Sequence, residues 1–413
     1  MKKSIFLRNS ILYTVGSMLT PLIGFIMLPI YTNYLTPSEY GTLSTITTLV
    51  GMFQVFLLLS LHGAVTRFYF EYVENSKEQR EYLGAIYLFV IIFSTTLSFL
   101  LITLKNQIGS LLFSIIPIDP YFILMVALSW SNALLALPFA LIRAQERAGM
   151  FVLANFLITL SIMVLNVYII VIKDLGIEKV LLSQFLITFI AVLILVSSQF
   201  KYLKFNLNYN FIKLSLLFSI PLLPHVASGW IIKSSDRVIL EKFVSLTDIG
   251  VYAVAVQVSM VLIIFYQSIN SALVPRYIKL MKDNQVLEAE KILKIFKIII
   301  FCTGILAIPI SMIATRLLVG EDFINAVWLL PALLIANMIK GIYYIPVAKL
   351  FYDSRTGAIA TSSTIAAITN IVVNFSLIPY IGIIGAVIST LLSEIIRTIL
   401  IYIASKQKKY DRS

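Results

Sequence analysis

The sequence has little charge and very few of the residues that bind metals or form disulfides. Charged residues make up 13% of the 413 positions, about half the share of an average soluble domain. There is one cysteine, Cys302, and there are two histidines, His62 and His225. A single cysteine excludes an intrachain disulfide, and no carboxylates stand at ligand spacing from the histidines. We therefore expect neither a metal site nor a resident cofactor.

Apolar residues make up 59% of the chain, and they recur in runs of about 20 or more residues. A helical run of that length matches the roughly 30 Å hydrocarbon core of a bilayer. Spans in lipid must be helical because backbone groups there need internal partners, and a β-barrel would show short alternating segments. The sequence predicts an all-α integral membrane protein of about twelve transmembrane helices. The predicted spans are 9–35, 41–66, 83–103, 120–141, 150–172, 178–198, 218–243, 248–274, 292–314, 323–348, 357–378 and 383–404.

The positive charges fall mainly on one side of these spans. The chain has 32 Lys and Arg against 20 Asp and Glu, a net charge of +12. Of these cations, 23 lie in the tails and the even-to-odd loops, and only 5 lie in the opposite loops. By the positive-inside rule, both termini are cytoplasmic. The net charge is thus a signal of topology, and we expect no nucleic-acid partner.

The chain repeats itself with an offset of about 209 residues. Three matched pairs of segments, in the same order in both halves, carry the repeat. They are Leu35–Gly41 with Val244–Gly250, Arg147–Gly149 with Arg355–Gly357, and Leu175–Ile177 with Ile381–Ile383. Each repeat holds six spans, so both halves enter the membrane from the same side. We predict two six-helix bundles, 1–205 and 206–413, related by a pseudo-twofold axis along the membrane normal, as in one class of transporter.

Several of these segments also resemble a known family. The opening Asn9–Tyr31, the following Leu35–Gly41, and Ser235–Leu240 with Gly250–Tyr252 are similar to polysaccharide biosynthesis proteins of the Wzx type. These are O-antigen and capsule flippases within the multidrug/oligosaccharidyl-lipid/polysaccharide exporter superfamily. The resemblance covers essentially the whole chain. It implies a multi-pass protein of the inner (plasma) membrane with a central cavity and alternating access.

The resemblance also implies a substrate and partners. The substrate would be an undecaprenyl-diphosphate-linked oligosaccharide, moved to the outer leaflet for O-antigen, lipopolysaccharide, capsule or another surface polysaccharide. Membrane lipid surrounds such a protein, and a polysaccharide polymerase and a chain-length regulator are candidate partners. A flippase of this kind is not an enzyme and has no catalytic residues.

Charged residues inside the spans are the candidate substrate-binding site, since a charge at bilayer depth costs at least about 2.5–3.5 kcal/mol. Through the repeat, Lys233, Asp236 and Arg237 align with positions inside the first span. They form either a cavity wall that holds phosphate or sugar, or a cluster that satisfies itself between packed helices. Lys340 has no acid one turn away, which favours a functional role. Arg397 lies three residues from Glu394, a spacing that permits a helical ion pair.

Four cations against two acids in the spans favour an anionic substrate, with Lys and Arg as phosphate partners. Arg67 and Arg276 are repeat-equivalent and end their spans on the cytoplasmic side. They are either topology anchors or a paired entrance that meets the diphosphate. His225, Asp236 and Glu394 are the candidate groups for coupling to an ion gradient, because they are titratable and lie within spans.

Two other functions compete with the flippase. The first is a multidrug extrusion antiporter of the same superfamily; such proteins export cations and keep acids in the membrane, whereas the first span here has none. The second is a membrane polysaccharide polymerase. It would need reactive groups on a sizeable outer loop, and the outer loops are short and contain no histidine.

Overall fold

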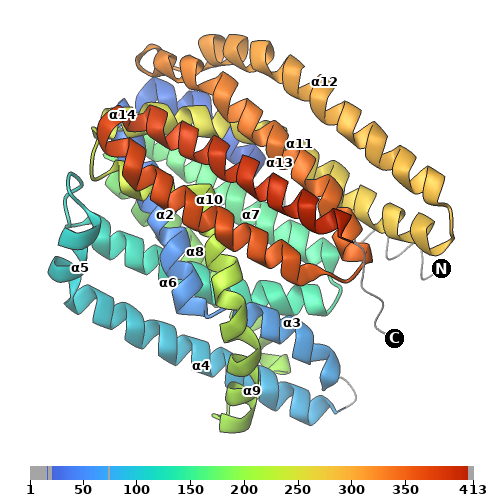
Figure 1. Ribbon diagram of the computed structural model, residues 1–413. Helices are drawn as coiled ribbons and strands as arrows, with labels where there is room; N and C mark the ends of the chain where they lie inside the picture. The colour runs from blue at the N-terminus through green and yellow to red at the C-terminus, as the bar shows by residue number, and fades with distance from the viewer. Residues whose placement is uncertain (1–15, 17–20, 73–74, 408–413) are drawn as a thin grey trace. The chain divides into compact units, whose positions relative to one another are not determined.

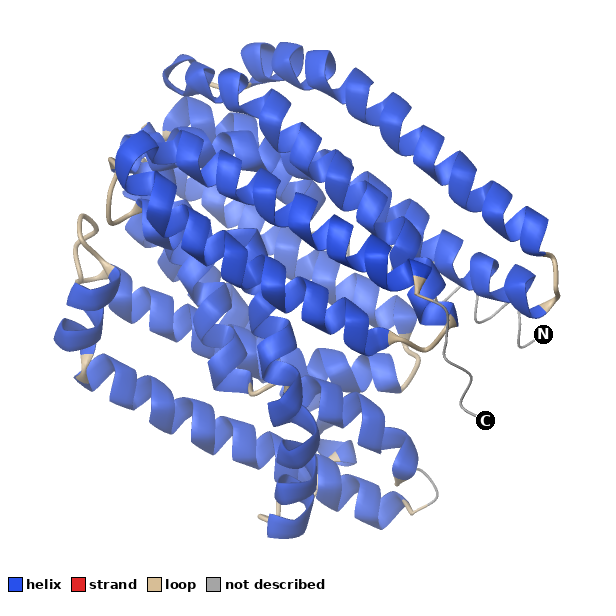
Figure 2. Ribbon diagram, viewed as in Figure 1, coloured by secondary structure: helices blue, strands red, loops and turns tan. Residues whose placement is uncertain are grey.

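The computed structural model describes residue 16 and residues 21–72 and 75–407, and every regular element among them is a helix (Figure 2). Ten of these helices are long and apolar enough to cross a membrane. One of the ten, α14 (Thr356–Lys406), breaks at Gly382 and contributes two spans. Residues 21–34 are helical as well and belong to the predicted first span. The all-helical membrane fold with about twelve spans is confirmed.

The chain divides into two compact units, each of which is described by itself. Unit 1 comprises Thr42–Ala227 and the described part of Met1–Ile30, and unit 2 comprises Tyr31–Gly41 and Ser228–Ser413. The helices up to the middle of the chain are α2 (Pro37–Leu58), α3 (Leu61–Glu71), α4 (Ser76–Thr103), α5 (Lys105–Leu112), α6 (Tyr121–Ala144), α7 (Ala148–Val167), α8 (Gly176–Gln199) and α9 (Tyr209–Ser219). The remaining helices are α10 (Leu223–Leu240), α11 (Leu246–Lys282), α12 (Val286–Leu318), α13 (Leu330–Tyr352) and α14. The lobes predicted from the repeat, 1–205 and 206–413, stay a prediction.

The repeat is visible in local backbone geometry at equivalent positions. The turns that precede α7 and α14 each contain a residue in the left-handed region, Glu146 (φ 56) and Ser354 (φ 58). The hairpins that follow turn at glycines of positive φ, Gly176 (φ 73) and Gly382 (φ 57). Glycine suits both turns because it lacks a Cβ that would clash in this conformation.

The first turns of α2 and α11 are capped in the same way. The hydroxyl of Thr36 accepts from the backbone N–H of Glu39 at 3.3 Å, and the hydroxyl of Ser245 accepts from the N–H of Asp248 at 3.1 Å. In each case the acid at the third position receives a hydrogen bond back from the capping hydroxyl. Each hydroxyl oxygen thereby satisfies an N–H group that has no partner within the helix.

Two repeat-equivalent glycines let these helix ends touch within unit 2. A Cβ on Gly41 would lie 2.1 Å from the carbonyl oxygen of Leu246, and a Cβ on Gly250 would lie 2.0 Å from that of Pro37. The two contacts exchange under the repeat, because Pro37 and Leu246 are themselves equivalent. Only glycine permits this approach of backbone to backbone.

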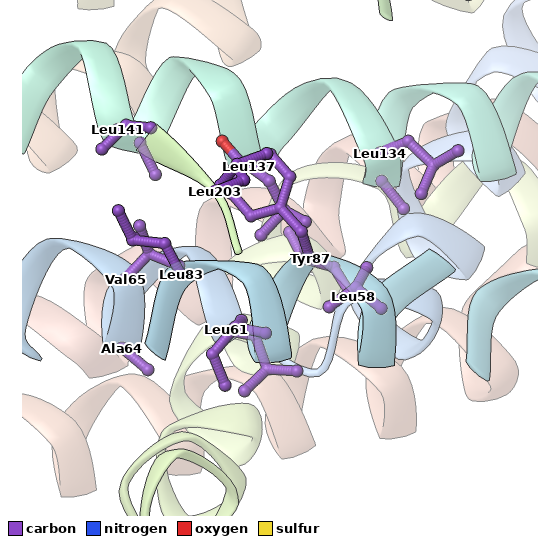
Figure 3. Packing of buried hydrophobic residues seen from close by; sticks show 14 of the residues in the cluster. Leu58, Leu61, Ala64, Val65, Leu83, Tyr87, Leu134, Leu137, Leu141 and Leu203 are labelled. Atoms are coloured by element: carbon purple, nitrogen blue, oxygen red, sulfur yellow. The ribbon is translucent and has the colours of Figure 1, made fainter. Parts of the chain in front are cut away.

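The core of unit 1 lies where α3, α4 and α6 pack together (Figure 3). Leu61 and Val65 of α3 meet Leu83 of α4 and Leu137 of α6, and all four side chains are almost fully buried. Tyr87 of α4 joins them, with its hydroxyl donating to Oε1 of Gln199 at 2.7 Å. In unit 2, α11 and α12 run as neighbouring long helices, and α14 folds back on itself (Figure 1).

Two predicted spans are interrupted. The span 218–243 begins inside a longer helical stretch in which a 3-10 turn, Ile220–Leu222, separates α9 from α10. Pro221 explains this turn, because proline has no N–H to donate to a helix. The span 41–66 breaks at Leu59 (φ 50) and Ser60 (φ 57). Neither residue is a helix breaker, so the pattern of the sequence gives no sign of this interruption.

Candidate functional site

Lys340, Glu394 and Arg397 form an ion triad between α13 and α14 in unit 2. Oε1 of Glu394 lies 3.8 Å from Nζ of Lys340, and Oε2 lies 3.4 Å from Nη1 of Arg397. The Glu394 side chain is 3% exposed, against 24% for Lys340 and 16% for Arg397. The interpretation of Lys340 as a lone cation is therefore wrong, because its acid comes from another helix. The predicted spacing of Glu394 and Arg397 does form a pair.

Arg397 is held from two directions. Its guanidinium carbon lies 3.9 Å from the centre of the Tyr343 ring on α13. Arginine stacks on an aromatic face in this way because the ring carries negative charge density above its plane. The tyrosine and the glutamate together fix the orientation of the guanidinium, whose Nε has no partner among the described residues.

Asp236 takes part in a different set of contacts. It is 5% exposed and accepts a hydrogen bond from the hydroxyl of Tyr252 on α11. Its other oxygen accepts from the backbone N–H of Arg237 at 2.8 Å. No ion pair among the described residues links Asp236 to Lys233. The predicted group of Lys233, Asp236 and Arg237 on α10 thus separates into a buried carboxylate and two cations with other surroundings.

Lys233 is the most accessible of the four candidate cations Lys233, Arg237, Lys340 and Arg397. Its side chain is exposed, whereas Arg237 is half-buried. Lys233 has no carboxylate within ion-pair distance among the described residues, and the like charges of Lys340 and Arg237 are among its neighbours. An exposed cation repelled by its neighbours favours binding of an incoming anion.

A buried network of amide and hydroxyl groups fastens α10 to both halves of α14. The hydroxyl of Ser235 donates to Oδ1 of Asn370 at 3.1 Å, and Nδ2 of Asn374 donates to the same oxygen at 3.1 Å. Across the hairpin, Oγ of Ser389 donates to the Asn370 carbonyl at 2.9 Å. The repeat-equivalent hairpin of α7 and α8 has a similar bond, from Ser183 to Asn166 at 2.9 Å.

This network positions the candidate residues. Ser235 immediately precedes Asp236 in the chain. The hydroxyl of Ser393 lies 3.3 Å from Nδ2 of Asn370, and Ser393 immediately precedes Glu394. Sequence reasoning missed Tyr252, Tyr343 and Asn370. The signal for Asn370 was present, because small polar residues within an apolar span commonly form hydrogen bonds between helices.

The remaining predicted site residues are Arg67, Arg276 and His225. Arg67 of α3 is exposed in unit 1, with its guanidinium carbon 4.9 Å from the centre of the Phe218 ring. Arg276 of α11 is exposed in unit 2. His225 is an exposed residue of α10 in the part that belongs to unit 1. The paired entrance and the coupling role of His225 stay predictions.

The cluster in unit 2 contains four cations, Lys233, Arg237, Lys340 and Arg397, and two buried acids, Asp236 and Glu394. One acid is shared by two cations and the other is occupied by Tyr252. Its chemistry suits the binding of an anionic group by ammonium and guanidinium donors. Across the described part of the chain, no group of three or more His, Cys, Asp or Glu is placed to hold a metal ion.

Two relatives of known sequence cover this chain to different extents. The Lsg locus putative protein 1 of Haemophilus influenzae is 25% identical over 405 residues, which is 92% of this chain and 94% of that protein. The probable flippase AglR of Haloferax volcanii is 28% identical over 214 residues, which is 48% of this chain and 44% of that protein.

Two solved structures share the fold. The lipid II flippase MurJ in an inward closed conformation has a TM-score of 0.79 at 14% identity, covering 96% of this chain and 88% of that one. An inward-facing multidrug resistance transporter of the MATE family has a TM-score of 0.75 at 13% identity, covering 96% and 97%. The family described as polysaccharide biosynthesis protein matches residues 6–281. That match spans more than half of the chain, and it confirms the predicted resemblance: the chain belongs to the polysaccharide biosynthesis protein family.

Proposed function

We propose that this protein is a flippase that carries an undecaprenyl-diphosphate-linked oligosaccharide from the cytoplasmic to the outer leaflet of the inner membrane by alternating access. Membership of the polysaccharide biosynthesis family supports a role in glycan export. One relative is named a probable flippase and another a probable low-salt glycan biosynthesis flippase. The exported glycan is assigned to O-antigen, lipopolysaccharide, capsule or another surface polysaccharide.

The observation that carries the proposal is the excess of cations in the membrane-spanning helices of unit 2. A diphosphate brings negative charge into a medium where isolated charge is costly, so its carrier must supply positive partners. Lys233 is exposed and has no carboxylate within ion-pair distance among the described residues, and Lys340 and Arg397 share a single carboxylate. These three side chains hold positive charge that the protein itself does not fully neutralise.

The second candidate is a multidrug extrusion antiporter, favoured by the likeness to the MATE transporter. A site for cationic drugs should present acids to the ligand. Here both acids are buried, and each already has partners. A polysaccharide polymerase has no supporting observation, and the two relatives whose names state a role are named as probable flippases.

The test is complementation of a strain that lacks its lipid-linked oligosaccharide flippase, using variants of Lys233. Lys233 is a cleaner choice than Lys340, because Lys340→Glu would place a second acid beside Glu394 and disturb the fold. We expect Lys233→Arg to retain most surface polysaccharide. Lys233→Gln should lose one charge-assisted hydrogen bond, about 1.5–3 kcal/mol, which corresponds to roughly a 10- to 150-fold loss of substrate affinity.

Lys233→Glu should be at least as damaging as Lys233→Gln, with normal abundance of protein in the membrane. The matched control is Lys242→Glu, which makes the same change of charge at an exposed lysine just beyond the end of α10, and it should export normally. A drug extruder would tolerate Lys233→Glu or gain cation transport from it. Normal polysaccharide in both Lys233→Gln and Lys233→Glu would refute the cationic site.

The proposal also covers the coupling of transport to an ion gradient and the proteins that receive the glycan. Asp236 and Glu394 are assigned to ion coupling because they are buried carboxylates joined to groups on other helices, so that a change in their charge would alter helix contacts. His225 is assigned to the same role as an exposed titratable group of α10. A polymerase and a chain-length regulator would receive the glycan on the outer side.

A further inference from the structure

Two apolar cavities lie on opposite faces of α8 in unit 1. The first, about 230 Å³, is formed with α4 and α6 and is lined by Phe189 and Val196 of α8. The second, about 250 Å³, is formed with α7 and is lined by Ala191 and Ile194 of α8. At about 100° per residue, these two pairs of positions point in opposite directions from the helix axis.

The walls of both cavities offer almost no polar group to a ligand. In the first cavity, the hydroxyl of Tyr87 already donates to Oε1 of Gln199 at 2.7 Å, and Nε2 of Gln199 donates to the Pro138 carbonyl at 3.1 Å. The second cavity is lined by Met, Leu, Ile and Ala side chains alone. Because the surrounding helices span the membrane, the matching occupant is hydrocarbon.

The length of the first cavity matches one leaflet. Phe189 and Phe200 both line it, and a helix rises about 16 Å over that interval at 1.5 Å per residue. Half of the roughly 30 Å hydrocarbon core is about 15 Å. On α7, the second cavity extends from Met150 to Ile158, which is about 12 Å by the same rise.

The two cavities end near two cations that share one tyrosine. Lys201 follows Phe200 of the first cavity, and Arg147 precedes Met150 of the second. Nη2 of Arg147 donates to the hydroxyl of Tyr202 at 2.8 Å, and Nζ of Lys201 lies 5.1 Å from the centre of the same ring. Lys201 is exposed and has no carboxylate within ion-pair distance among the described residues. One tyrosine thus brings together two cations at the ends of two apolar cavities.

We propose that an anionic glycerophospholipid binds astride α8, with one acyl chain in each cavity and its phosphate on Lys201 and Arg147. The two cavities with a shared cationic end fit a lipid with two chains, whereas the single chain of an isoprenoid carrier would fill only one. The positive-inside rule places this lipid in the cytoplasmic leaflet. The site lies within unit 1, on other helices than the cation cluster of unit 2, and it does not depend on the transported substrate.

The test is native mass spectrometry of the purified full chain with phosphatidylglycerol and with phosphatidylcholine of identical acyl chains. We expect phosphatidylglycerol to be retained and phosphatidylcholine to be lost. Lys201→Gln should weaken phosphatidylglycerol retention about fivefold, the effect of one basic residue near an anionic lipid. The matched control is Lys173→Gln, because Nζ of Lys173 lies 5.9 Å from the Tyr168 ring at the opposite end of the same hairpin, where neither cavity reaches.

A ligand-side comparison needs no variant and so does not depend on folding. Lysophosphatidylglycerol, with one chain, should be retained more weakly than phosphatidylglycerol. Equal retention of the one-chain and two-chain lipids would overturn the assignment of a chain to each cavity. Equal retention of phosphatidylcholine and phosphatidylglycerol would overturn the phosphate site. Stronger retention of undecaprenyl phosphate than of phosphatidylglycerol would identify an isoprenoid site instead.

Discussion

Removing the charge of Glu394 should destabilise the protein more than removing either of its partners. Glu394→Gln leaves Lys340 and Arg397 facing each other within the membrane with no countercharge between them. Two unit charges about 4 Å apart interact by about 4 kcal/mol at an effective dielectric constant of 20, and loss of one partner from a buried pair costs about 3–5 kcal/mol. Because both cations retain some exposure, we expect the low end, about 3 kcal/mol.

Lys340→Met should cost less, about 1–2 kcal/mol as for an ordinary destabilising substitution, because Glu394 keeps Arg397 as a partner at 3.4 Å. In the double variant Lys340 is absent, so Glu394→Gln no longer leaves it without a countercharge. The double variant should therefore lose less unfolding free energy than the sum of the losses of the two single variants. The expected coupling is at least about 1 kcal/mol, well within the range seen for residues in contact. The assay is equilibrium unfolding of the purified protein in one detergent, for the two single variants and the double variant.

The control is a second lysine on the same helix. Nζ of Lys349 lies 2.6 Å from Glu290, but their side chains are 33% and 50% exposed. Glu290→Gln should therefore change stability by about 0–1 kcal/mol. An unfolding free energy of Glu394→Gln within 0.5 kcal/mol of the unchanged protein would refute the triad. Additivity of Glu394→Gln and Lys340→Met would refute the shared carboxylate.

Three further outcomes are expected. A reporter fused after Lys105 should face outward and reporters at either terminus should face the cytoplasm; cytoplasmic activity after Lys105 would contradict the charge count. Gly250→Ala should reduce folded protein, because its Cβ would meet the Pro37 carbonyl at 2.0 Å and overpacking costs about 1–3 kcal/mol. Gly149→Ala, where a Cβ meets nothing within 4 Å, is the control. Flipping in reconstituted vesicles should fall when proton and sodium gradients are collapsed, and unchanged flipping would remove the coupling role of Asp236, Glu394 and His225.

The features of the fold that depend on residues close together in the chain could be predicted from the sequence. The lengths of the apolar runs follow from the thickness of the bilayer, and the chain of helices was predicted from them. The repeat predicted equivalent positions whose backbone geometry does agree, such as Gly176 and Gly382. Pro221 marked the interruption before α10 because its chemistry acts on its own turn. The break at Leu59 and Ser60 has no such local cause in the sequence.

The partners of the intramembrane charges depend on how helices face one another, and short spacing does not reveal that. The pair of Glu394 with Arg397 was visible because both lie on one helix, three residues apart. The pair of Glu394 with Lys340 joins α14 to α13, and Asp236 finds Tyr252 on α11 rather than a cation on its own helix. Spacing within one helical turn therefore makes Lys340 appear isolated and places Asp236 beside Lys233. In an apolar span an unpaired charge is costly, so a charged side chain there needs a partner. Lys233 has no carboxylate partner among the described residues. Of the candidate residues it is therefore the one best placed to bind a ligand.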